Sequence, residues 1–380
     1  MNHIALVVPT IDRIGGAERQ VLLLARGLRI RGWQVTLIAL SGSGGNASSE
    51  LTSIGIHFLS LGMRKGLADP RGWIRFHNWM QRARPDVLHT HLPHATWLAR
   101  WSRLTAPCRA VIDTIHSPAT GTPARKLGYR LSNRLSDRIT AVSPAAAASW
   151  LSQHVVHPER LSVLPNGVDT NYWKPDPAVR IEMRERLGIK DEFVWLSVGR
   201  LEPVKDHHTL LRAIPDLSPN TKLVIAGAGR LENDLRKLSF DLGLNGQVRF
   251  LGFERGIRRW MQAADAFVLT SLYEGLPMAL LEASSCGLPA VVSDIPGANE
   301  IIGSEAASLK FAVGDTASLM IAMTELMQMS PSAMVAMVDC TRNLIQQQFS
   351  LERILDSWEA LYCKVLQTNP TPRRWAACDR

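Results

Sequence analysis

The chain has 380 residues, of which 46% are hydrophobic and 20% charged, and its formal net charge at pH 7 is +9. This length fits two domains of about 150 to 200 residues each, and the composition disfavours a long disordered chain. No stretch approaches the roughly 20 apolar residues of a membrane-spanning helix, which disfavours an integral membrane protein.

Cysteine usage and the N-terminal stretch indicate a cytoplasmic protein. The five cysteines are odd in number and form no C-x-x-C pair, which disfavours a disulfide framework or a zinc site and favours a reducing compartment. Asp12 and Arg13 follow the first apolar run, whereas a secretory signal carries its positive charge before that run.

The positive charge is concentrated in the first half of the chain. Residues 1–170 contain 20 Lys and Arg against 9 Asp and Glu, a net +11, and residues 171–380 contain the remaining 23 and 25, a net −2 (11 − 2 = 9). This asymmetry indicates an anionic partner for the first half: a membrane surface, a phosphorylated substrate or a nucleic acid.

Short apolar runs predict strands, and amphipathic stretches such as 15–32 predict helices between them. In chain order the predicted strands lie within 3–9, 33–40, 56–61, 86–91, 109–116, 138–144, 160–169, 192–200, 221–229, 247–253, 266–271 and 289–294. Strands that alternate with helices predict an α/β fold of two doubly wound, Rossmann-like domains with parallel sheets. The Pro-, Asn- and Gly-rich stretch 165–177 is the predicted linker, and the cleft between the domains is the expected site.

Glycines and an aromatic residue follow some of these strands. Gly15 and Gly16 open the first helix, where free N–H groups favour an anion, although a plain tight turn explains the pattern equally well. Gly227 permits either a close approach of a ligand or a turn. Phe253 could lie against a flat ring, although a core position is commoner for an aromatic. The glycine spacing is not the G-x-G-x-x-G of dinucleotide-binding proteins, which disfavours a dehydrogenase.

Two cations follow the strand at 192–200. Arg200 and Lys205 lie five positions apart and could clamp a diphosphate. The alternative is a pair of solvated charges that interact with Glu202 or Asp206.

The stretch SLYEGLPMALLEAS (271–284) holds two acids, Glu274 and Glu282, with only apolar residues and glycine between them. Pro277 as the first residue and Gly287 just past the end predict a helix of about ten residues. Glu274 then lies in the preceding loop and Glu282 more than a turn into the helix. The lone Glu282 either pairs with a nearby Arg or backbone donor, or accepts the hydroxyls of a ribose. We favour the ribose, because the first amides of the helix are also placed to meet a ligand.

These motifs together resemble retaining nucleotide-sugar glycosyltransferases of glycosyltransferase family 4, which have the GT-B fold of two Rossmann-like domains facing a cleft. The resemblance covers nearly the whole chain and depends on the order and spacing of many motifs. They are GGAE (15–18), DVLHTH (86–91), His116, AVSP (141–144), LPNGVD (164–169), VGRLEPVKD (198–206), AGAG (226–229), FLGF (250–253), E-x7-E (274–282) and GLPAVVSDIPGANEII (287–302). One departure is the segment after Glu300, which has fewer glycines than the family's segment.

The resemblance implies a role for each matched residue. Arg200 and Lys205 match the pair that neutralises the donor diphosphate. Glu282 matches the acid that holds the ribose hydroxyls, Glu274 the acid that faces the transferred sugar, and His116 the histidine near that sugar. The implied catalytic residues are therefore Glu274, Lys205, Arg200 and His116. The implied donor-binding residues are Gly15, Gly16, Arg200, Lys205, Gly227, Gly252, Phe253, Glu274, Gly275, Leu276, Met278, Leu280 and Glu282, and no metal ligand is among them.

The resemblance also implies an acceptor-binding domain over 1–168 and a nucleotide-sugar-binding domain over 169–350. A helix within 351–368 would cross back to the first domain, and 369–380 would be a tail. The implied reaction moves a sugar from a UDP- or GDP-linked donor to an acceptor hydroxyl with retention of configuration and without a metal or other cofactor. The family frequently serves cell-surface polysaccharide or glycolipid synthesis.

Residues 97–138 contain eight Lys or Arg against two Asp, and aromatic residues interleave with them. The residues concerned are Trp97, Arg100, Trp101, Arg103, Lys126, Tyr129 and Arg130. The pattern suits an anionic membrane at the inner face, where the acceptor would be a sugar or a lipid-linked saccharide. A solvated helical face over core aromatics explains it equally well. No nucleic-acid-binding motif is present, which disfavours a nucleic acid partner.

Two alternatives share the scaffold. One is another GT-B enzyme, either a sugar-nucleotide epimerase, which would convert the donor without an acceptor, or a phosphorylase-like protein. The other is a non-catalytic nucleotide-sugar-binding protein, against which the four intact residues Arg200, Lys205, Glu274 and Glu282 argue.

Overall fold

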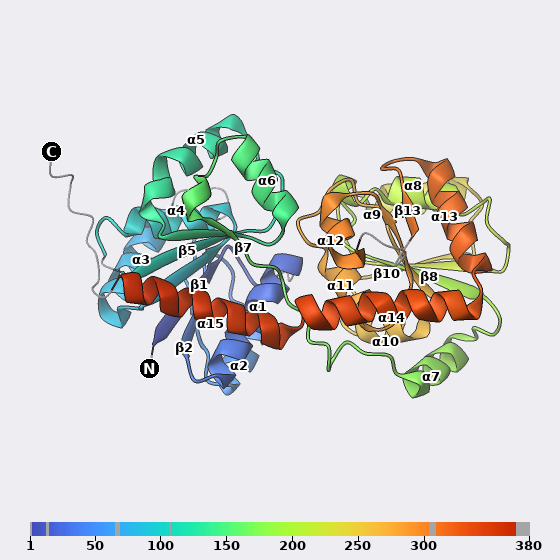
Figure 1. Ribbon diagram of the computed structural model, residues 1–380, viewed down its shortest axis with the longest axis horizontal. Coiled ribbons are helices and arrows are strands. Elements are labelled where there is room, and N and C mark those ends of the chain that lie inside the picture. Colours follow the sequence, from blue (N-terminus) through green and yellow to red (C-terminus); the bar gives the residue numbers. More distant parts are fainter. Residues whose placement is uncertain (1, 13–14, 65–68, 107, 304–308, 370–380) are drawn as a thin grey trace. The chain divides into compact units, whose positions relative to one another are not determined.

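The computed structural model describes residues 2–12, 15–64, 69–106, 108–303 and 309–369. The chain divides into two compact units, which Figure 1 shows as ribbons. The first unit takes residues 1–167 together with 351–380, and the second takes residues 168–350. Cys108, Cys286, Cys340 and Cys363 carry free thiols. Arg13, Cys378 and the predicted tail beyond residue 369 lie outside the described residues.

The first unit is built on a seven-stranded parallel sheet in the order β3-β2-β1-β4-β5-β6-β7. Its strands are β1 (His3–Val8), β2 (Gln34–Ala39), β3 (His57–Ser60), β4 (Val87–His91), β5 (Ala110–Ile115), β6 (Arg138–Ala141) and β7 (Leu161–Val163). The central strands are buried along their whole length, as the strands of a sheet covered on both faces must be.

Helices cover both faces of this sheet. The helices of the unit are α1 (Gly16–Ile30), α2 (Gly45–Ser53), α3 (Pro70–Ala83), α4 (Pro93–Ser102), α5 (Pro123–Ser132), α6 (Pro144–Ser152) and α15 (Leu351–Thr368), with 3-10 turns at Asn133–Leu135 and Pro158–Arg160. Ile4 and Leu6 of β1 pack with α1, α2 and α15, whereas the alternate residues Ala5 and Val7 pack with α3 and α4. This alternation follows from the two-residue period of a strand.

The last helix, α15, is an integral part of the first unit, although the whole second unit precedes it in the chain. Its residues Trp358 and Tyr362 are buried in the core beneath β1, β4 and β5. Arg31, at the end of α1, pairs with Glu352 and Glu359, both at 2.7 Å. In Figure 1 α15 runs across the sheet beside α1.

The second unit has a six-stranded parallel sheet in the order β10-β9-β8-β11-β12-β13. Its strands are β8 (Phe193–Val198), β9 (Thr221–Ala226), β10 (Val248–Gly252), β11 (Ala266–Leu269), β12 (Ala290–Ser293) and β13 (Leu309–Phe311). Its helices are α7 (Pro177–Leu187), the 3-10 turn η3 (Pro203–Lys205), α8 (His207–Ala213), α9 (Glu232–Asp241), α10 (Ile257–Ala263), α11 (Met278–Ser285), α12 (Pro296–Ile302), α13 (Thr316–Gln328) and α14 (Pro331–Gln348).

One core of the second unit lies between this sheet and α8, α9 and α13. On the remaining side α11 and α12 pack against α14, and α10 packs against α7. Several helices of both units begin at a capping side chain followed directly by proline. The capping residues are Asp69, Thr122, Ser143, Asp176 and Ser330.

The predicted α/β class with two doubly wound sheets is confirmed, and the first twelve strands lie within their predicted ranges. β13 falls outside every predicted strand.

The two segments that connect the units pair with each other at Val168, whose N–H donates to the carbonyl of Phe349 at 2.8 Å. None of the described helices combines the length and the apolar composition that crossing a bilayer requires.

In each sheet the strand order reverses direction at one place, between β1 and β4 in the first unit and between β8 and β11 in the second. Loops at the carboxyl ends of the two strands diverge there, so the backbone leaves room for a ligand.

Candidate functional site

Two loops are joined at the reversal point of the second sheet. One follows β8 and includes η3, and the other follows β11. The N–H of Leu272 donates to the carbonyl of Val204, and Oγ1 of Thr270 donates to the carbonyl of Lys205, both at 2.8 Å. These bonds fix the backbone of Lys205 beside the loop that carries Glu274.

Nζ of Lys205 forms an ion pair with Oε1 of Glu274, which also accepts a hydrogen bond from Oγ of Ser271 at 2.9 Å. Each of the two charged side chains is 17% exposed, so water screens the pair only in part. The alternative in which Lys205 pairs with Glu202 or Asp206 is therefore wrong. Glu202 instead pairs with Arg230 at 2.9 Å, and the carboxylate of Asp206 caps α8.

Arg200 lies just beyond the end of β8 and is exposed. Its guanidinium has no ion-pair partner among the described residues. A guanidinium that no carboxylate neutralises can accept a phosphate in a bidentate geometry. The end of β8 therefore provides one uncompensated cation and one cation that a carboxylate holds in place.

Helix α11 begins one residue later than predicted, because Pro277 is its N-cap and Met278 its first residue. The helix has eight residues, and Gly287 follows its end with a φ of 82°. The Leu280 N–H already donates to the carbonyl of Pro277 at 3.1 Å. The amides of Met278 and Ala279 are therefore the first that a ligand can reach. Glu282 is 2% exposed in the middle of this helix.

The side chains of Leu276, Met278 and Leu280 are buried, at 5%, 7% and 0% exposed. They anchor the loop and the start of α11 in the core, so only their backbone is left to face a ligand. Gly275 is also buried. A Cβ on Gly297 of α12 would lie 2.6 Å from the carbonyl oxygen of Gly275, so the two backbones are in close contact.

The glycines of this edge bring backbone segments together. A Cβ on Gly227 would lie 1.7 Å from the carbonyl oxygen of Gly199, so the close approach that Gly227 permits is to the neighbouring loop. Its N–H donates to the carbonyl of Gly252 at 2.8 Å, and Gly252 has a φ of 68°. Phe253 is 65% exposed, so the interpretation of Phe253 as a core aromatic is wrong.

In the first unit, Gly15 is the N-cap of α1 and Gly16 its first residue. The Gly15 N–H donates to Oε2 of Glu18 at 3.0 Å, and a Cβ on Gly15 would lie 2.8 Å from that oxygen. The carboxylate of Glu18 therefore accepts the hydrogen bond of the Gly15 amide.

His116 follows β5 and belongs to a group of three histidines. The two-residue period of β4 places His89 and His91 on one face, the face that α15 covers. Nε2 of His116 lies 3.0 Å from Nδ1 of His91. The sequence analysis assigns no role to His89 or His91, although the H-x-H pattern inside a predicted strand is the signal that they share a face.

Burial lowers the pKa of His116 to about 4. Burial also lowers the pKa of His89 and of His91 well below the ordinary value of 6.5, with a smaller effect from the neighbouring imidazoles. All three side chains are neutral at pH 7. They therefore act as hydrogen-bond donors and acceptors rather than as cations.

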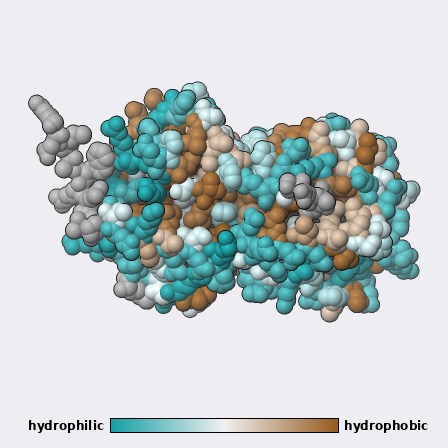
Figure 2. Space-filling model, viewed as in Figure 1, coloured by the Kyte–Doolittle hydropathy of each residue, from teal (hydrophilic) through white to brown (hydrophobic). Residues whose placement is uncertain are grey.

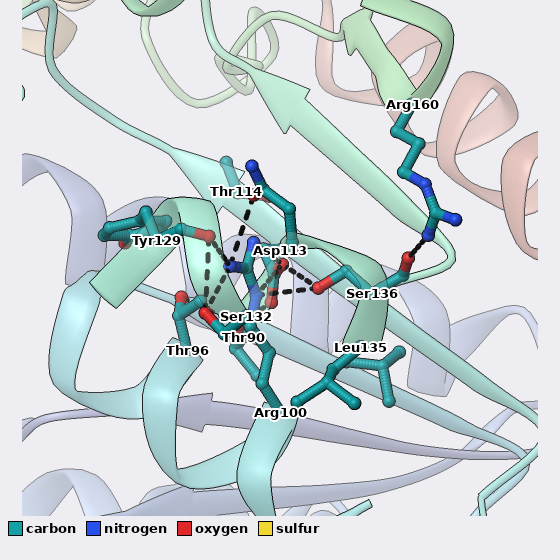
Figure 3. A network of polar contacts seen from close by, with 12 residues as sticks. Thr90, Thr96, Arg100, Asp113, Thr114, Tyr129, Ser132, Leu135, Ser136 and Arg160 are labelled. Atoms are coloured by element: carbon teal, nitrogen blue, oxygen red, sulfur yellow. Dashed lines mark hydrogen bonds and ion pairs between the residues drawn. The ribbon is translucent and has the colours of Figure 1, made fainter. Parts of the chain in front are cut away.

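The structure corrects the predicted basic and aromatic surface. Arg100 is 0% exposed, and its Nη2 lies 2.7 Å from Oδ2 of Asp113 on the buried α4 face of the sheet. Figure 3 shows the surrounding network, in which Arg100 also donates to Ser132 at 2.9 Å and to Ser136 at 2.8 Å. Tyr129 is 4% exposed. Arg103 is also buried and pairs with Asp137 at 2.7 Å. The prediction is therefore wrong for Arg100, Arg103 and Tyr129.

Together the described residues of the second unit offer an anion site. In the described ranges no three His, Cys, Asp or Glu side chains gather as metal ligands would. The second sheet presents Lys205 beside the carboxylate of Glu274, Arg200 at the end of β8, and the first amides of α11 directly after the loop that carries Glu274. Cations and free amides of this kind stabilise a phosphate, and a carboxylate accepts hydroxyl hydrogen bonds.

Comparison with known proteins defines the class. The family model described as "Glycosyltransferase Family 4" matches residues 14–172, and the model described as "Glycosyl transferases group 1" matches residues 179–338. A galactosyltransferase of Escherichia coli, UDP-Gal:alpha-D-GlcNAc-diphosphoundecaprenol alpha-1,3-galactosyltransferase, is 30% identical over 312 residues, which cover 78% of this chain and 80% of the relative. The chain belongs to glycosyltransferase family 4 and is a GT-B enzyme that transfers a sugar from a nucleotide sugar.

Other relatives and structures agree with this class. An N-acetylgalactosaminyltransferase of Campylobacter jejuni, named for an N-acetylgalactosamine-N,N'-diacetylbacillosaminyl-diphospho-undecaprenol substrate, is 27% identical over 306 residues, 77% of this chain and 81% of the relative. The crystal structure of Anabaena HepE with UDP-glucose matches with a TM-score of 0.83 at 21% identity, over 96% of this chain and 99% of that chain. The structural match shows that the two chains share a fold.

Proposed function

We propose that this glycosyltransferase transfers a hexosyl group, with retention of configuration, from a UDP- or GDP-linked sugar to a hydroxyl of a lipid-linked saccharide. The relatives support both halves of the proposal. The Escherichia coli relative is named for UDP-Gal and a diphosphoundecaprenol-linked acceptor. A mannosyltransferase of Mycolicibacterium smegmatis, 32% identical over 238 residues, 55% of this chain and 61% of the relative, is named for GDP-mannose and a phosphatidylinositol monomannoside.

The ion pair between Lys205 and Glu274 is the observation that carries the proposal. It brings one cation and one carboxylate together at the reversal point of the second sheet, and we assign the cation to the donor diphosphate and the carboxylate to the donor sugar. Arg200 supplies the second cation. Glu282, on α11, accepts the ribose hydroxyls. The negative charge that develops on the departing diphosphate is stabilised by the two cations, which is electrostatic catalysis.

Retention requires that the new bond form on the face from which the diphosphate leaves. The acceptor oxygen bonds to the anomeric carbon as the bond between that carbon and the phosphate oxygen breaks, and the departing phosphate takes the acceptor proton. Glu274 forms no covalent bond in this sequence.

The exposed side of α5 is the part of the first unit that suits a membrane. Leu127 and Leu131, one helical turn apart, are 54% and 69% exposed. Lys126 lies next to Leu127, and Arg130 next to Leu131. Figure 2 shows hydrophobic residues reaching the surface of the first unit over α5, beside hydrophilic ones. Apolar side chains flanked by cations bind an anionic bilayer interface, which is where a lipid-linked acceptor is presented.

The test of the reaction is a transfer assay with a panel of UDP- and GDP-linked hexoses and an N-acetylglucosamine-diphospholipid acceptor. The expected result is one glycosylated lipid whose new anomeric centre has the configuration of the donor, measured by its one-bond and vicinal NMR couplings. Inversion at that centre would contradict retention. Conversion of the donor without an acceptor would instead favour the epimerase alternative, and nucleotide binding without any turnover would favour the binding protein.

The test of the membrane surface is flotation with vesicles that contain anionic lipid, at low salt. We expect wild type to float, and the double variant Leu127→Ser/Leu131→Ser to stay at the bottom of the gradient. Ile321→Ser is a matched control, because Ile321 is a 60% exposed apolar residue on α13 of the second unit. Equal flotation of all three proteins would show that α5 is not the membrane-binding surface.

A further inference from the structure

The three histidines of the first unit form a chain of ring contacts that runs from β4 to the residue after β5. His116 contacts His91, the ring of His91 lies 4.1 Å from the ring of His89, and Nδ1 of His89 lies 2.8 Å from the hydroxyl of Tyr362 on α15. The ring of Trp358, also on α15, lies 4.6 Å from the ring of His89. His89 and His91 are 0% and 2% exposed. Their arrangement fixes which nitrogen of each ring carries the proton.

The position of the ring proton of His89 follows from a chain of hydrogen bonds that begins at a backbone carbonyl. The direction of the chain is fixed because a carbonyl oxygen can only accept. Oγ1 of Thr140 donates to the carbonyl of Asp113 at 3.2 Å, so the hydroxyl of Thr114, 2.8 Å away, donates to Thr140. Oγ1 of Thr114 must then accept from Nε2 of His89 at 2.7 Å. His89 is therefore protonated on Nε2, and its Nδ1 accepts from the hydroxyl of Tyr362.

The proton of His91 follows from its one unpartnered nitrogen. Nε2 of His91 is buried and has no hydrogen-bond partner among the described residues. A buried N–H without an acceptor is rarer in proteins than a buried acceptor without a donor. The proton of His91 therefore lies on Nδ1 and is donated to Nε2 of His116 at 3.0 Å. His116 then carries its own proton on Nδ1, which no described residue bonds.

We propose that His91 is a positioning residue for the transfer reaction: by donating to Nε2 of His116, it holds His116 in the tautomer whose Nδ1–H is offered to a hydroxyl of the donor sugar. His89 supports it, because the ring of His89 is fixed at both nitrogens and lies against the ring of His91 at an interplanar angle of 43°. The reaction part of this inference rests on the proposed function. The tautomers themselves are a property of the first unit alone.

The experiment that tests the proposal is a long-range proton–nitrogen correlation spectrum of the full chain labelled with ¹⁵N-histidine, recorded at pH 7 without substrate. We expect His91 and His116 as Nδ1–H tautomers and His89 as the Nε2–H tautomer. In His91→Leu, His116 should lose its fixed Nδ1–H tautomer. In His91→Asn, the amide nitrogen occupies the place of Nδ1 and should restore it. His94→Leu is a matched control, because His94 is exposed and lies three residues further along the chain.

The same variants are then compared by steady-state transfer kinetics. We expect kcat to fall about tenfold in His91→Leu with KM little changed, and to recover most of that loss in His91→Asn. An Nε2–H tautomer of His116 in wild type, an unchanged tautomer in His91→Leu, or equal rates in His91→Leu and His91→Asn would each overturn the proposal. A wild type that turns over no nucleotide sugar would instead reject the proposed function, because the spectrum decides the tautomers by itself.

Discussion

Lys205 and Glu274 lie 69 residues apart in the chain and form an ion pair at the reversal point of the second sheet. The contact depends on two hydrogen bonds between their loops, made by Thr270 and Leu272. Each charge thus fixes the position of the other before a substrate binds. A site arranged in this way needs little reorganisation when negative charge develops on the leaving group.

We expect Lys205→Ala and Glu274→Ala each to lower the transfer rate by far more than tenfold, which is more than about 1.4 kcal/mol of transition-state stabilisation. The reason is that each change removes one charge and releases its partner. The measurement is kcat/KM with the preferred donor. Glu202→Gln is the control, since it breaks the neighbouring pair with Arg230 in the same turn and should leave the rate nearly unchanged. Near-normal turnover in either alanine variant would contradict the role assigned to the pair.

A second prediction concerns Glu282. In a thermal-shift panel of UDP, GDP, ADP and dTDP with EDTA present, one nucleotide at 100 times its dissociation constant should add about 2.7 kcal/mol to the free energy of unfolding. We expect Glu282→Gln to lose most of this effect, because a neutral amide is a poorer acceptor for two ribose hydroxyls. The control is Glu232→Gln, which breaks the surface ion pair between Glu232 and Arg236. A full shift in Glu282→Gln would place the ribose elsewhere.

The buried pair of Arg100 and Asp113 gives a prediction about stability. Asp113→Ala leaves the guanidinium of Arg100 buried without a counter-charge, so we expect a loss of about 3–5 kcal/mol in the free energy of unfolding, measured by urea denaturation. Glu50→Ala breaks the exposed pair with Arg26 and should cost no more than about 1 kcal/mol. Similar losses in the two variants would show that the buried network contributes no more than a surface pair.

The stability of the second unit should depend on pH through His207, which is 2% exposed. Burial lowers the pKa of His207 to about 4 in the folded chain, from an ordinary value of 6.5. Between these two values the unfolded chain binds a proton that the folded chain does not. The free energy of unfolding should therefore fall as the pH drops from 6.5 towards 4, by about 1.4 kcal/mol per pH unit for this residue.

The check is a series of urea unfolding curves between pH 6.5 and pH 4.5. His207→Leu should have a shallower dependence on pH than wild type. His157→Leu, which removes an exposed histidine, should keep the wild-type dependence. If His207→Leu and wild type lose stability in parallel, then His207 does not contribute to the pH dependence.

Local pattern predicts this fold well because most strands are continuous apolar runs. β13 is missed because Leu309, Lys310 and Phe311 form too short a run, and β13 is a strand only by pairing with β12 at the edge of the sheet. Pro277 predicts the start of α11 one residue early, because proline is favoured at the first helical position, whereas here it is the N-cap.

Sequence alone was less informative about partners in space. The sequence offers two acids close to Lys205 in the chain as partners, whereas the acid that Lys205 contacts, Glu274, lies 69 positions away. A surface position is wrong for Arg100, because a basic helix looks the same in sequence whether its cations face water or a buried carboxylate. For Tyr129 the alternative of a core aromatic holds. The H-x-H pattern of β4 showed which face His89 and His91 share, but not that Tyr362 of the last helix would meet them.

Because α15 belongs to the first unit, the second unit can fold before the first unit during synthesis. The second unit is complete once residue 350 has been made, and its entry and exit segments already lie side by side. The first unit begins earlier but lacks Trp358 and Tyr362 until the last helix leaves the ribosome. We therefore expect the nascent chain to hold an unfinished N-terminal unit, with part of its core exposed, while the inserted unit folds. A nonsense mutation shortly after residue 350 would leave the second unit complete and deprive the first unit of α15, so that only the first unit would fail to fold.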